Sequence, residues 1–333
     1  MPKTTLLVVG TGGFARGHLR NISKLRSPPQ FAGFVEVSEE QRENTRARMK
    51  EVGVPCPPFF DSIGHFLKSG NQAETALICT PHKFHFEHAA ACLQAGMDVL
   101  LEKPMVMNAD EARRLIRIRD RTKRLLVVAF PGSLSPAVNK AKAMIAANKL
   151  GRITAISACA FQAWKKGTTG TWRQKPEISG GGFLFDTGSH MVNTVLDLAG
   201  EDVRRLSASF DNCGTPVEIL SSVGGQFASG AMFSLCADGD SVSCQSRILV
   251  MGDQGVLETG IWGERLNFAS AKSNWQMEPV KGGRGRSVWE TFVLVRAGRI
   301  ANPGPAEVGL RFAKFMDMTR TSAATGRTIT ARR

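Results

Sequence analysis

The stretch that decides the fold is Thr5–Ala15, TLLVVGTGGFA. The strand-forming run Thr5–Val9 leads directly into a glycine-rich turn. In this turn Gly10, Gly12 and Ala15 have the spacing G-x-G-x-x-A at the start of a predicted helix. The first glycine permits the tight turn, the second lets the backbone approach a pyrophosphate, and the small third residue lets helix and strand pack closely. Phosphates would lie at the positive N-terminal end of the helix. The stretch predicts a dinucleotide-binding turn formed by Gly10, Gly12, Gly13, Phe14 and Ala15.

An acidic residue ends the second predicted strand, Phe31–Glu36. Glu36 lies 21 residues beyond Ala15. A carboxylate at this place accepts hydrogen bonds from the ribose hydroxyls of NAD and repels the 2′-phosphate of NADP. The sequence therefore favours NAD, while Ser38, Arg42 and Arg46 follow closely enough to keep NADP open.

Strands and helices go on alternating through the first half of the chain. Apolar runs of this length, separated by helical stretches, are typical of a parallel sheet buried on both faces. We therefore expect residues 1–128 to form a doubly wound α/β domain. Its further strands are predicted at Thr75–Cys79, Asp98–Leu101 and Leu125–Ala129, and its helices at Glu39–Val52, Glu87–Ala95 and Ala109–Arg121.

The second half, residues 129–333, has a different pattern. From Val203 to Glu278, strands with Gly and Asp turns follow one another with almost no helix, which is typical of an antiparallel sheet with one open face. We expect a second α/β domain built on this large, mostly antiparallel sheet, with a C-terminal helix that can pack back on the first domain. Its other elements are predicted at Pro136–Asn148 (helix), Ile153–Trp164 (strand), Thr187–Leu198, Val288–Ala297 and Ala306–Ala324 (helices).

The composition argues against several classes of protein. No run approaches the roughly 20 apolar residues of a membrane span, and the N-terminus has no leader pattern. Seven scattered cysteines without a CxxC pair favour reduced thiols in the cytoplasm over disulfides or structural zinc. The net charge of +14 is spread along the chain, so it favours an anionic cofactor or substrate over nucleic acid. The absence of tyrosine excludes a tyrosine general acid.

A lysine follows the predicted strand Asp98–Leu101, in the motif Glu102-Lys103-Pro104. At the C-terminal end of a parallel strand, its side chain would point into the crevice where such sheets bind ligands. The proline biases Lys103 toward extended backbone. A surface lysine in a turn is the competing interpretation.

A second candidate motif is Asp186-Thr-Gly-Ser-His190. If a helix begins near Asp186, the i, i+4 spacing places the carboxylate and the imidazole on one face, with Asn193 one turn further. This arrangement suits an acid–base histidine tuned by a nearby charge. Two alternatives stay open: an N-cap aspartate beside an unrelated histidine, and half of a metal site.

Three histidines, His82, His85 and His88, have a spacing that invites a metal hypothesis. The spacing spreads them too widely around a helix to converge on one ion. We therefore expect no metal site.

Together the motifs resemble the glucose–fructose oxidoreductase/inositol dehydrogenase (Gfo/Idh/MocA) family over essentially the whole chain. The resemblance implies a Rossmann domain followed by an α/β domain whose open sheet often forms an oligomer interface, hence a homodimer or homotetramer. It also implies oxidation or reduction of a carbohydrate or cyclitol hydroxyl with a nicotinamide cofactor. The motifs are GTGGFARGH, TPHKFHFEHA, EKP, WRQKPEISGGGFLFDTGSH and GPAEVGLRFAKFMDMTRTSAATGRTI.

The same resemblance implies roles for the motif residues. Lys103 would hydrogen-bond the reacting oxygen, and His190 would be the general base. Asp186 would help to bind the substrate and tune the pair. The expected cofactor-binding residues beyond the glycine turn and Glu36 are Thr80, Pro81, His85, Glu102 and Lys103. The expected substrate-binding residues are Lys103, Trp164, Trp172, Arg173, Asp186, His190 and Asn193.

Two departures from the family pattern concern the substrate pocket. Asn193 stands where many relatives carry aspartate, and Phe130–Leu134 (FPGSL) replaces an arginine-containing segment. Neither departure touches Lys103, Asp186 or His190.

The function that the sequence predicts is an NAD(P)-dependent dehydrogenase or reductase acting on a CH–OH group of a sugar, sugar derivative or polyol. One alternative is an NAD-dependent glycosidase that oxidises its sugar transiently. Another is a non-catalytic protein that senses NAD or a sugar. The sensor is disfavoured because such relatives generally lack the lysine or the histidine.

Overall fold

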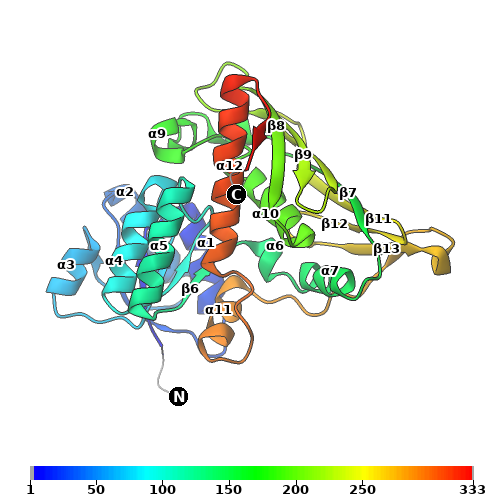
Figure 1. Cartoon of the computed structure of the whole chain (residues 1–333). Coiled ribbons are helices and arrows are strands. Elements are labelled where there is room, and N and C mark those ends of the chain that lie inside the picture. The colour runs from blue at the N-terminus through cyan, green and yellow to red at the C-terminus, as the bar shows by residue number, and fades with distance from the viewer. Residues whose placement is uncertain (1–3, 332–333) are drawn as a thin grey trace. The chain divides into compact units, whose positions relative to one another are not determined.

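The computed structural model describes residues 4–331, and the chain divides into two compact units (Figure 1). The first unit comprises the chain up to Ala129 together with Ser287–Ala306. The second comprises Phe130–Arg286 and the chain from Glu307 onward.

The segment Ser287–Ala306 lies in the first unit, whereas the predicted division at residue 128 assigns it to the second half. Its helix is anchored because Arg296 Nε donates to Asp98 Oδ2 at 2.8 Å. Beyond the helix, the amide of Val128 donates to Gly304 O at 2.7 Å. Periodicity identifies this segment as a helix but does not say which core it packs against.

The first unit contains a six-stranded parallel sheet in the order β3-β2-β1-β4-β5-β6. This is the doubly wound order with a reversal between β1 and β4, so the predicted first fold is confirmed. The strands are β1 (Thr5–Val9), β2 (Gln30–Val35), β3 (Phe59–Phe60), β4 (Thr75–Ile78), β5 (Asp98–Leu101) and β6 (Leu126–Val128).

Helices cover this sheet, and α4 and α5 lie against each other (Figure 1). Two of these helices begin at a polar N-cap residue. Ser38 Oγ accepts from Gln41 N at the start of α2, and Asn108 Oδ1 accepts from Glu111 N at the start of α5. The helical elements are α1 (Gly13–Ser23), α2 (Glu39–Glu51), α3 (Ile63–Lys68), η1 (His82–Phe84), α4 (His85–Gln94), α5 (Ala109–Thr122) and α11 (Val288–Arg296).

The second unit is built on a nine-stranded sheet in the order β14-β13-β12-β11-β7-β10-β9-β8-β15. Every pairing in it is antiparallel except that of β10 with β7, which confirms the predicted mostly antiparallel sheet. The strands are β7 (Ile153–Phe161), β8 (Val203–Asp211), β9 (Leu220–Phe227), β10 (Met232–Asp238), β11 (Gln245–Gly252), β12 (Gly255–Thr259), β13 (Leu266–Ser270), β14 (Glu278–Pro279) and β15 (Ile329–Thr330).

One face of this sheet is covered and the other is open. Along β10, Phe233 and Leu235 are buried, whereas Met232, Ser234 and Cys236 are exposed. Helix α10 packs on the β7 and β11 strands. The helical elements of the second unit are α6 (Pro131–Leu134), α7 (Pro136–Ala146), α8 (Trp164–Thr168), η2 (Trp172–Gln174), α9 (Pro176–Ser179), α10 (Gly188–Ala199), η3 (Ala271–Ser273) and α12 (Ala306–Thr325), which begins at the boundary between the units.

Within residues 4–331, no helix is long and apolar enough to cross a bilayer. The seven cysteines are all free thiols. The described residues contain no group of three or more His, Cys, Asp or Glu side chains that could hold a metal ion.

Candidate active site

The glycine turn lies between β1 and α1, and its two leading glycines have different surroundings. Gly10 has φ of +81°, and a Cβ there would lie 2.7 Å from Thr80 Cγ2 and 2.9 Å from Thr80 N. Only glycine fits that position. A Cβ on Gly12 would meet nothing within 4 Å, so the backbone there faces open space. Ala15 is completely buried, as close packing of α1 requires, whereas the Phe14 ring is exposed.

The N-terminus of α1 has the properties that a bound pyrophosphate needs. The helix starts at Gly13, its N-cap Gly12 offers no capping side chain, and its first turn has no acidic residue. The first amide groups of a helix lack partners within the helix and carry partial positive charge. Together with the open space at Gly12, these features fit a dinucleotide.

Glu36 follows β2 and turns its carboxylate toward the glycine turn. Its Oε2 accepts from Thr11 N at 2.8 Å and from Thr11 Oγ1 at 3.2 Å. Its Oε1 accepts from the amides of Val37 and Ser38, each at 3.0 Å. The carboxylate is therefore fixed beside the turn, where the predicted contact with ribose requires it.

The His85 side chain lies between the segments that follow β4 and β5 and contacts a backbone carbonyl of each. Its Nδ1 lies 2.7 Å from Pro104 O and its Nε2 lies 2.8 Å from Thr80 O. Burial lowers the pKa of this imidazole, and the two backbone carbonyls oppose that effect. Thr80 and Pro81 lie between β4 and η1, and His85 is the first residue of α4, whereas half-buried Lys103 follows β5. The Lys103–Pro104 peptide bond is cis.

Glu102 has a partner, His18, that was not predicted from the sequence. Its Oε1 lies 2.7 Å from His18 Nε2, and its Oε2 accepts from the amide of Lys103 at 3.2 Å. His18 is on α1, one turn beyond Ala15. The signal in the sequence was its position: His18 lies three residues after Ala15 and therefore near the same face of α1. The cofactor helix and the Glu102-Lys103-Pro104 segment are therefore connected by side chains.

In the second unit, Asp186 is the centre of a polar cluster. Its Oδ2 accepts from Trp164 Nε1 and from Arg173 Nε, both at 2.9 Å. The Arg173 guanidinium lies over the Trp172 ring, 4.6 Å from its centroid. The structure thus brings together Trp164, Trp172, Arg173 and Asp186, four of the predicted substrate-binding residues.

Helix α10 begins at Gly188 with Thr187 as its N-cap, so Asp186 lies in the preceding turn. The predicted helix Thr187–Leu198 is confirmed to within one residue at each end, and the shared face of Asp186 and His190 stays a prediction. The alternative that Asp186 is the N-cap is wrong, because Thr187 occupies the cap and Asp186 accepts from Trp164 and Arg173.

His190 lies in the first turn of α10 and is only 9% exposed. Its ring is flanked by two aromatic side chains, Trp262 at 5.9 Å and Phe130 at 6.4 Å between ring centroids. Trp262 was not predicted, because a single tryptophan in a loop carries no signal in the sequence. An imidazole in this setting has little contact with water.

Asn193 belongs to a buried chain of hydrogen bonds. Its Nδ2 donates to Ser133 Oγ at 2.7 Å, and Ser133 Oγ donates to Asp197 Oδ2 at 2.5 Å. Arg311 forms an ion pair with Asp197, whose side chain is fully buried. Ser133 comes from the Phe130–Leu134 segment, one of the two departures from the family pattern. The two departures are therefore in direct contact.

Two of the three histidines of the metal hypothesis, His85 and His88, have hydrogen-bond partners within the first unit. His88 Nδ1 lies 3.1 Å from Thr80 Oγ1, and both ring nitrogens of His85 face backbone carbonyls.

A doubly wound parallel sheet with a glycine turn after its first strand is typical of dinucleotide-dependent oxidoreductases, and the second unit adds an aspartate just before a helix and a histidine in its first turn. Residues 4–130 match the oxidoreductase family with an NAD-binding Rossmann fold, and residues 138–258 match the GFO/IDH/MocA C-terminal domain. The chain belongs to the Gfo/Idh/MocA family of NAD-binding oxidoreductases. The predicted resemblance and the predicted NAD cofactor are confirmed at this level.

The relatives differ in how much of the chain they match. A scyllo-inositol 2-dehydrogenase (NADP(+)) of Bacillus subtilis is 32% identical over 127 residues, which are 38% of this chain and 35% of that enzyme. An inositol 2-dehydrogenase of Pseudomonas savastanoi is 23% identical over 259 residues, 75% of this chain and 72% of that enzyme. The chain thus covers about a third of the first relative and about three quarters of the second.

Among solved structures, levoglucosan dehydrogenase in complex with NADH and levoglucosan superposes with a TM-score of 0.83 at 19% identity. The match covers 99% of this chain and all of that one. At this identity the similarity establishes the fold.

Proposed function

We propose that this protein is an NAD-dependent dehydrogenase or reductase that transfers a hydride between the nicotinamide and a carbinol carbon of a sugar, sugar derivative or polyol. The observation that carries the proposal is the burial of Asp186 and His190. Two side chains from outside this segment, Trp164 and Arg173, donate to the Asp186 carboxylate and hold it in place. Family membership and the names of the relatives point to the same substrate class.

We assign three side chains to the reaction. In the direction of oxidation, His190 takes the proton of the hydroxyl group while a hydride leaves the carbon that bears this group. The C–H and O–H bonds break and a C=O bond forms. The Lys103 ammonium donates a hydrogen bond to the reacting oxygen and stabilises negative charge on it. Asp186, fixed by two donors, orients the substrate. Bound NAD supplies the hydride acceptor.

The second unit supports substrate binding by aromatic and polar side chains. Trp172 offers a ring face and Arg173 a rigid donor fork, both suited to a sugar. Trp164 acts on Asp186 through its indole N–H. We also propose Asn193 as a substrate-binding residue. Its amide nitrogen donates to Ser133 Oγ.

NAD is proposed over NADP because of the Glu36 carboxylate. Two carboxylate oxygens held beside the glycine turn would accept ribose hydroxyls and repel a 2′-phosphate. The family does not decide this choice, since the Bacillus subtilis relative is an NADP(+) enzyme by name.

We also propose that the protein forms a homo-oligomer and is located in the cytoplasm. Support for self-association comes from the small, uncharged side chains on the open face of the sheet, such as Ser157 and Ser234, whose hydroxyls lie 3.2 Å apart. Support for the cytoplasm comes from the free thiols.

Variants of the reacting groups test the activity on a panel of sugars, sugar acids and inositols, with reduced nicotinamide followed by absorbance. We expect turnover with NAD by the wild type. Lys103→Met should lower kcat by about 10²–10³-fold and His190→Asn by about 10²–10⁴-fold, because each removes a group needed only in the transition state. Lys83→Met, which removes an exposed lysine of the same unit, is the matched control. Unchanged turnover in both active-site variants would sink the proposal.

A further inference from the structure

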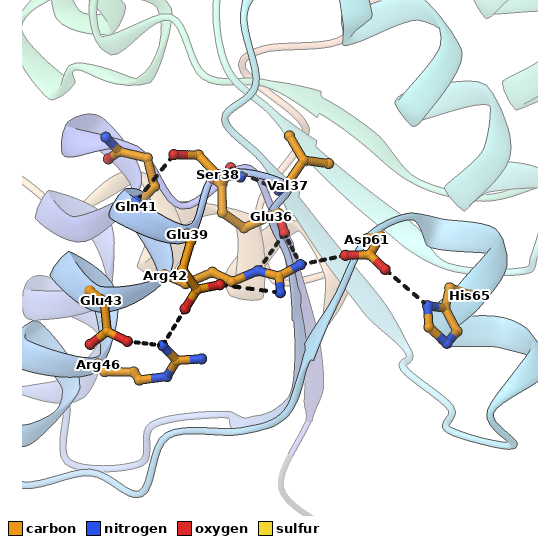
Figure 2. Close-up of polar contacts among 10 residues, drawn as sticks. All are labelled: Glu36, Val37, Ser38, Glu39, Gln41, Arg42, Glu43, Arg46, Asp61 and His65. Carbon is orange, nitrogen blue, oxygen red and sulfur yellow. Dashed lines mark hydrogen bonds and ion pairs between the residues drawn. The ribbon is translucent and has the colours of Figure 1, made fainter.

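The guanidinium of Arg42 lies against the backbone of Glu36 and is already engaged by hydrogen bonds and ion pairs (Figure 2). Arg42 Nε and Nη2 both donate to the backbone oxygen of Glu36, at 2.8 and 2.6 Å. Nη2 also donates to Asp61 Oδ1 at 2.5 Å, and Nη1 lies 3.6 Å from Glu39 Oε2. The Arg42 side chain is 18% exposed. Backbone and carboxylate partners therefore fix its direction.

Asp61 reaches Arg42 because of the sheet register. The amide of Glu36 donates to Phe60 O at 3.0 Å, so the residues that follow β2 and β3 are neighbours. Asp61 is the first residue after β3, and its carboxylate is 70% exposed. It thus adds negative charge to the same corner of the sheet as Glu36, from a different strand.

The second arginine of α2 near this corner is paired as well. Arg46 Nη1 donates to Glu39 Oε1 at 2.8 Å and forms an ion pair with Glu43 (Figure 2). Its guanidinium also lies 4.9 Å from the centroid of the Phe59 ring. Neither arginine is left as an isolated cation that could receive a phosphate.

An enzyme of this fold that uses NADP places an arginine near the end of the second strand, where it binds the 2′-phosphate. Arg42 has the residue type and the location for that role. In this structure, its donors are directed instead to the Glu36 carbonyl and to Asp61. A phosphate at the ribose would have to compete with Asp61 for the same guanidinium.

We infer that Asp61 is a cofactor-specificity residue: it holds Arg42 away from the ribose 2′ position and so disfavours NADP. It is a positioning residue that acts through Arg42, whereas Glu36 acts on the ribose directly. Two carboxylates from two strands then select NAD. The inference rests on the proposed function because it concerns the same cofactor site.

The test measures the dissociation constants of NAD⁺ and NADP⁺ by calorimetry, with the full-length protein and no substrate. Asp61→Asn should strengthen NADP⁺ binding by about tenfold, since a charge-assisted contact of Arg42 with phosphate becomes available, while NAD⁺ binding stays within about twofold. Asp61→Ala, a second change at this exposed position, should act in the same direction. Glu43→Gln is the matched control, because it removes one carboxylate from α2 without touching Arg42.

The double-mutant cycle with Arg42→Gln separates the specific role from a general effect of charge. In the Arg42→Gln background, Asp61→Asn should leave the ratio of the two constants unchanged. An unchanged ratio in Asp61→Asn alone, or an equal shift with and without Arg42, would overturn the inference. Failure of the wild type to bind NAD⁺ at all would instead overturn the proposed function.

Discussion

At the scale of single residues, the two leading glycines of the turn do different work. Gly10 is required by the fold, because its φ is positive and a Cβ there would collide with the Thr80 backbone. Gly12 has no such neighbour, so packing within the chain does not require glycine there. The motif alone does not separate these two roles.

Matched alanine variants test this separation. Gly10→Ala should lower the free energy of unfolding by about 2–4 kcal/mol, the sum of left-handed strain and overpacking. Gly12→Ala should keep that free energy within about 0.5 kcal/mol but weaken NAD⁺ binding by tenfold or more, because its Cβ occupies the approach of the pyrophosphate. Urea unfolding and calorimetry measure the two quantities. Equal losses of stability in both variants would contradict this assignment.

At the scale of elements, α10 is tied to α6 and α12 by the chain Asn193–Ser133–Asp197–Arg311. Ser133→Ala should destabilise the second unit by about 1–3 kcal/mol, since it removes a donor from the fully buried Asp197 carboxylate. Urea unfolding measures the loss. In an Asp197→Asn background the same change should cost less, because the buried charge is gone. A full loss that persists in that background would refute the coupling.

The sequence predicted regular elements better than special ones. Strands β1 and β5 have the predicted bounds, because buried parallel strands are continuous apolar runs between turns. The two-residue strand β3 was missed, since Phe59–Phe60 follows prolines and is too short for a pattern. The bounds of α10 were predicted to within one residue, but periodicity does not register the two donors, Trp164 and Arg173, that bind Asp186 in the preceding turn.

Candidate site residues could be named from the sequence only where they belong to a family motif. Lys103, Asp186 and His190 came from such motifs, whereas His18, Ser133 and Trp262 emerged only from contacts between distant segments. Side chains of this kind have no local sequence signal, because their neighbours are set by tertiary packing. That Asp61 pairs with Arg42 is a further example.

At the scale of the whole molecule, the open face of the nine-stranded sheet is the surface proposed for self-association. Ser234→Arg places a charge in the middle of this face, on the exposed side of β10. We expect it to convert the oligomer to monomers in light scattering coupled to size exclusion. Gln94→Arg, an exposed position at the end of α4 in the other unit, should leave the assembly intact. A monomeric wild type would contradict the proposed assembly.

The central claim is hydride transfer from a carbinol carbon to NAD, and isotope transfer tests it most directly. The protein is incubated with NAD⁺ and a panel of sugars and polyols deuterated at their carbinol carbons, and the reduced cofactor is analysed by mass spectrometry. We predict deuterium in NADH from at least one member of the panel, and its loss in His190→Asn. Wild-type protein that is saturated with NAD⁺ yet transfers deuterium from none of them would contradict the account.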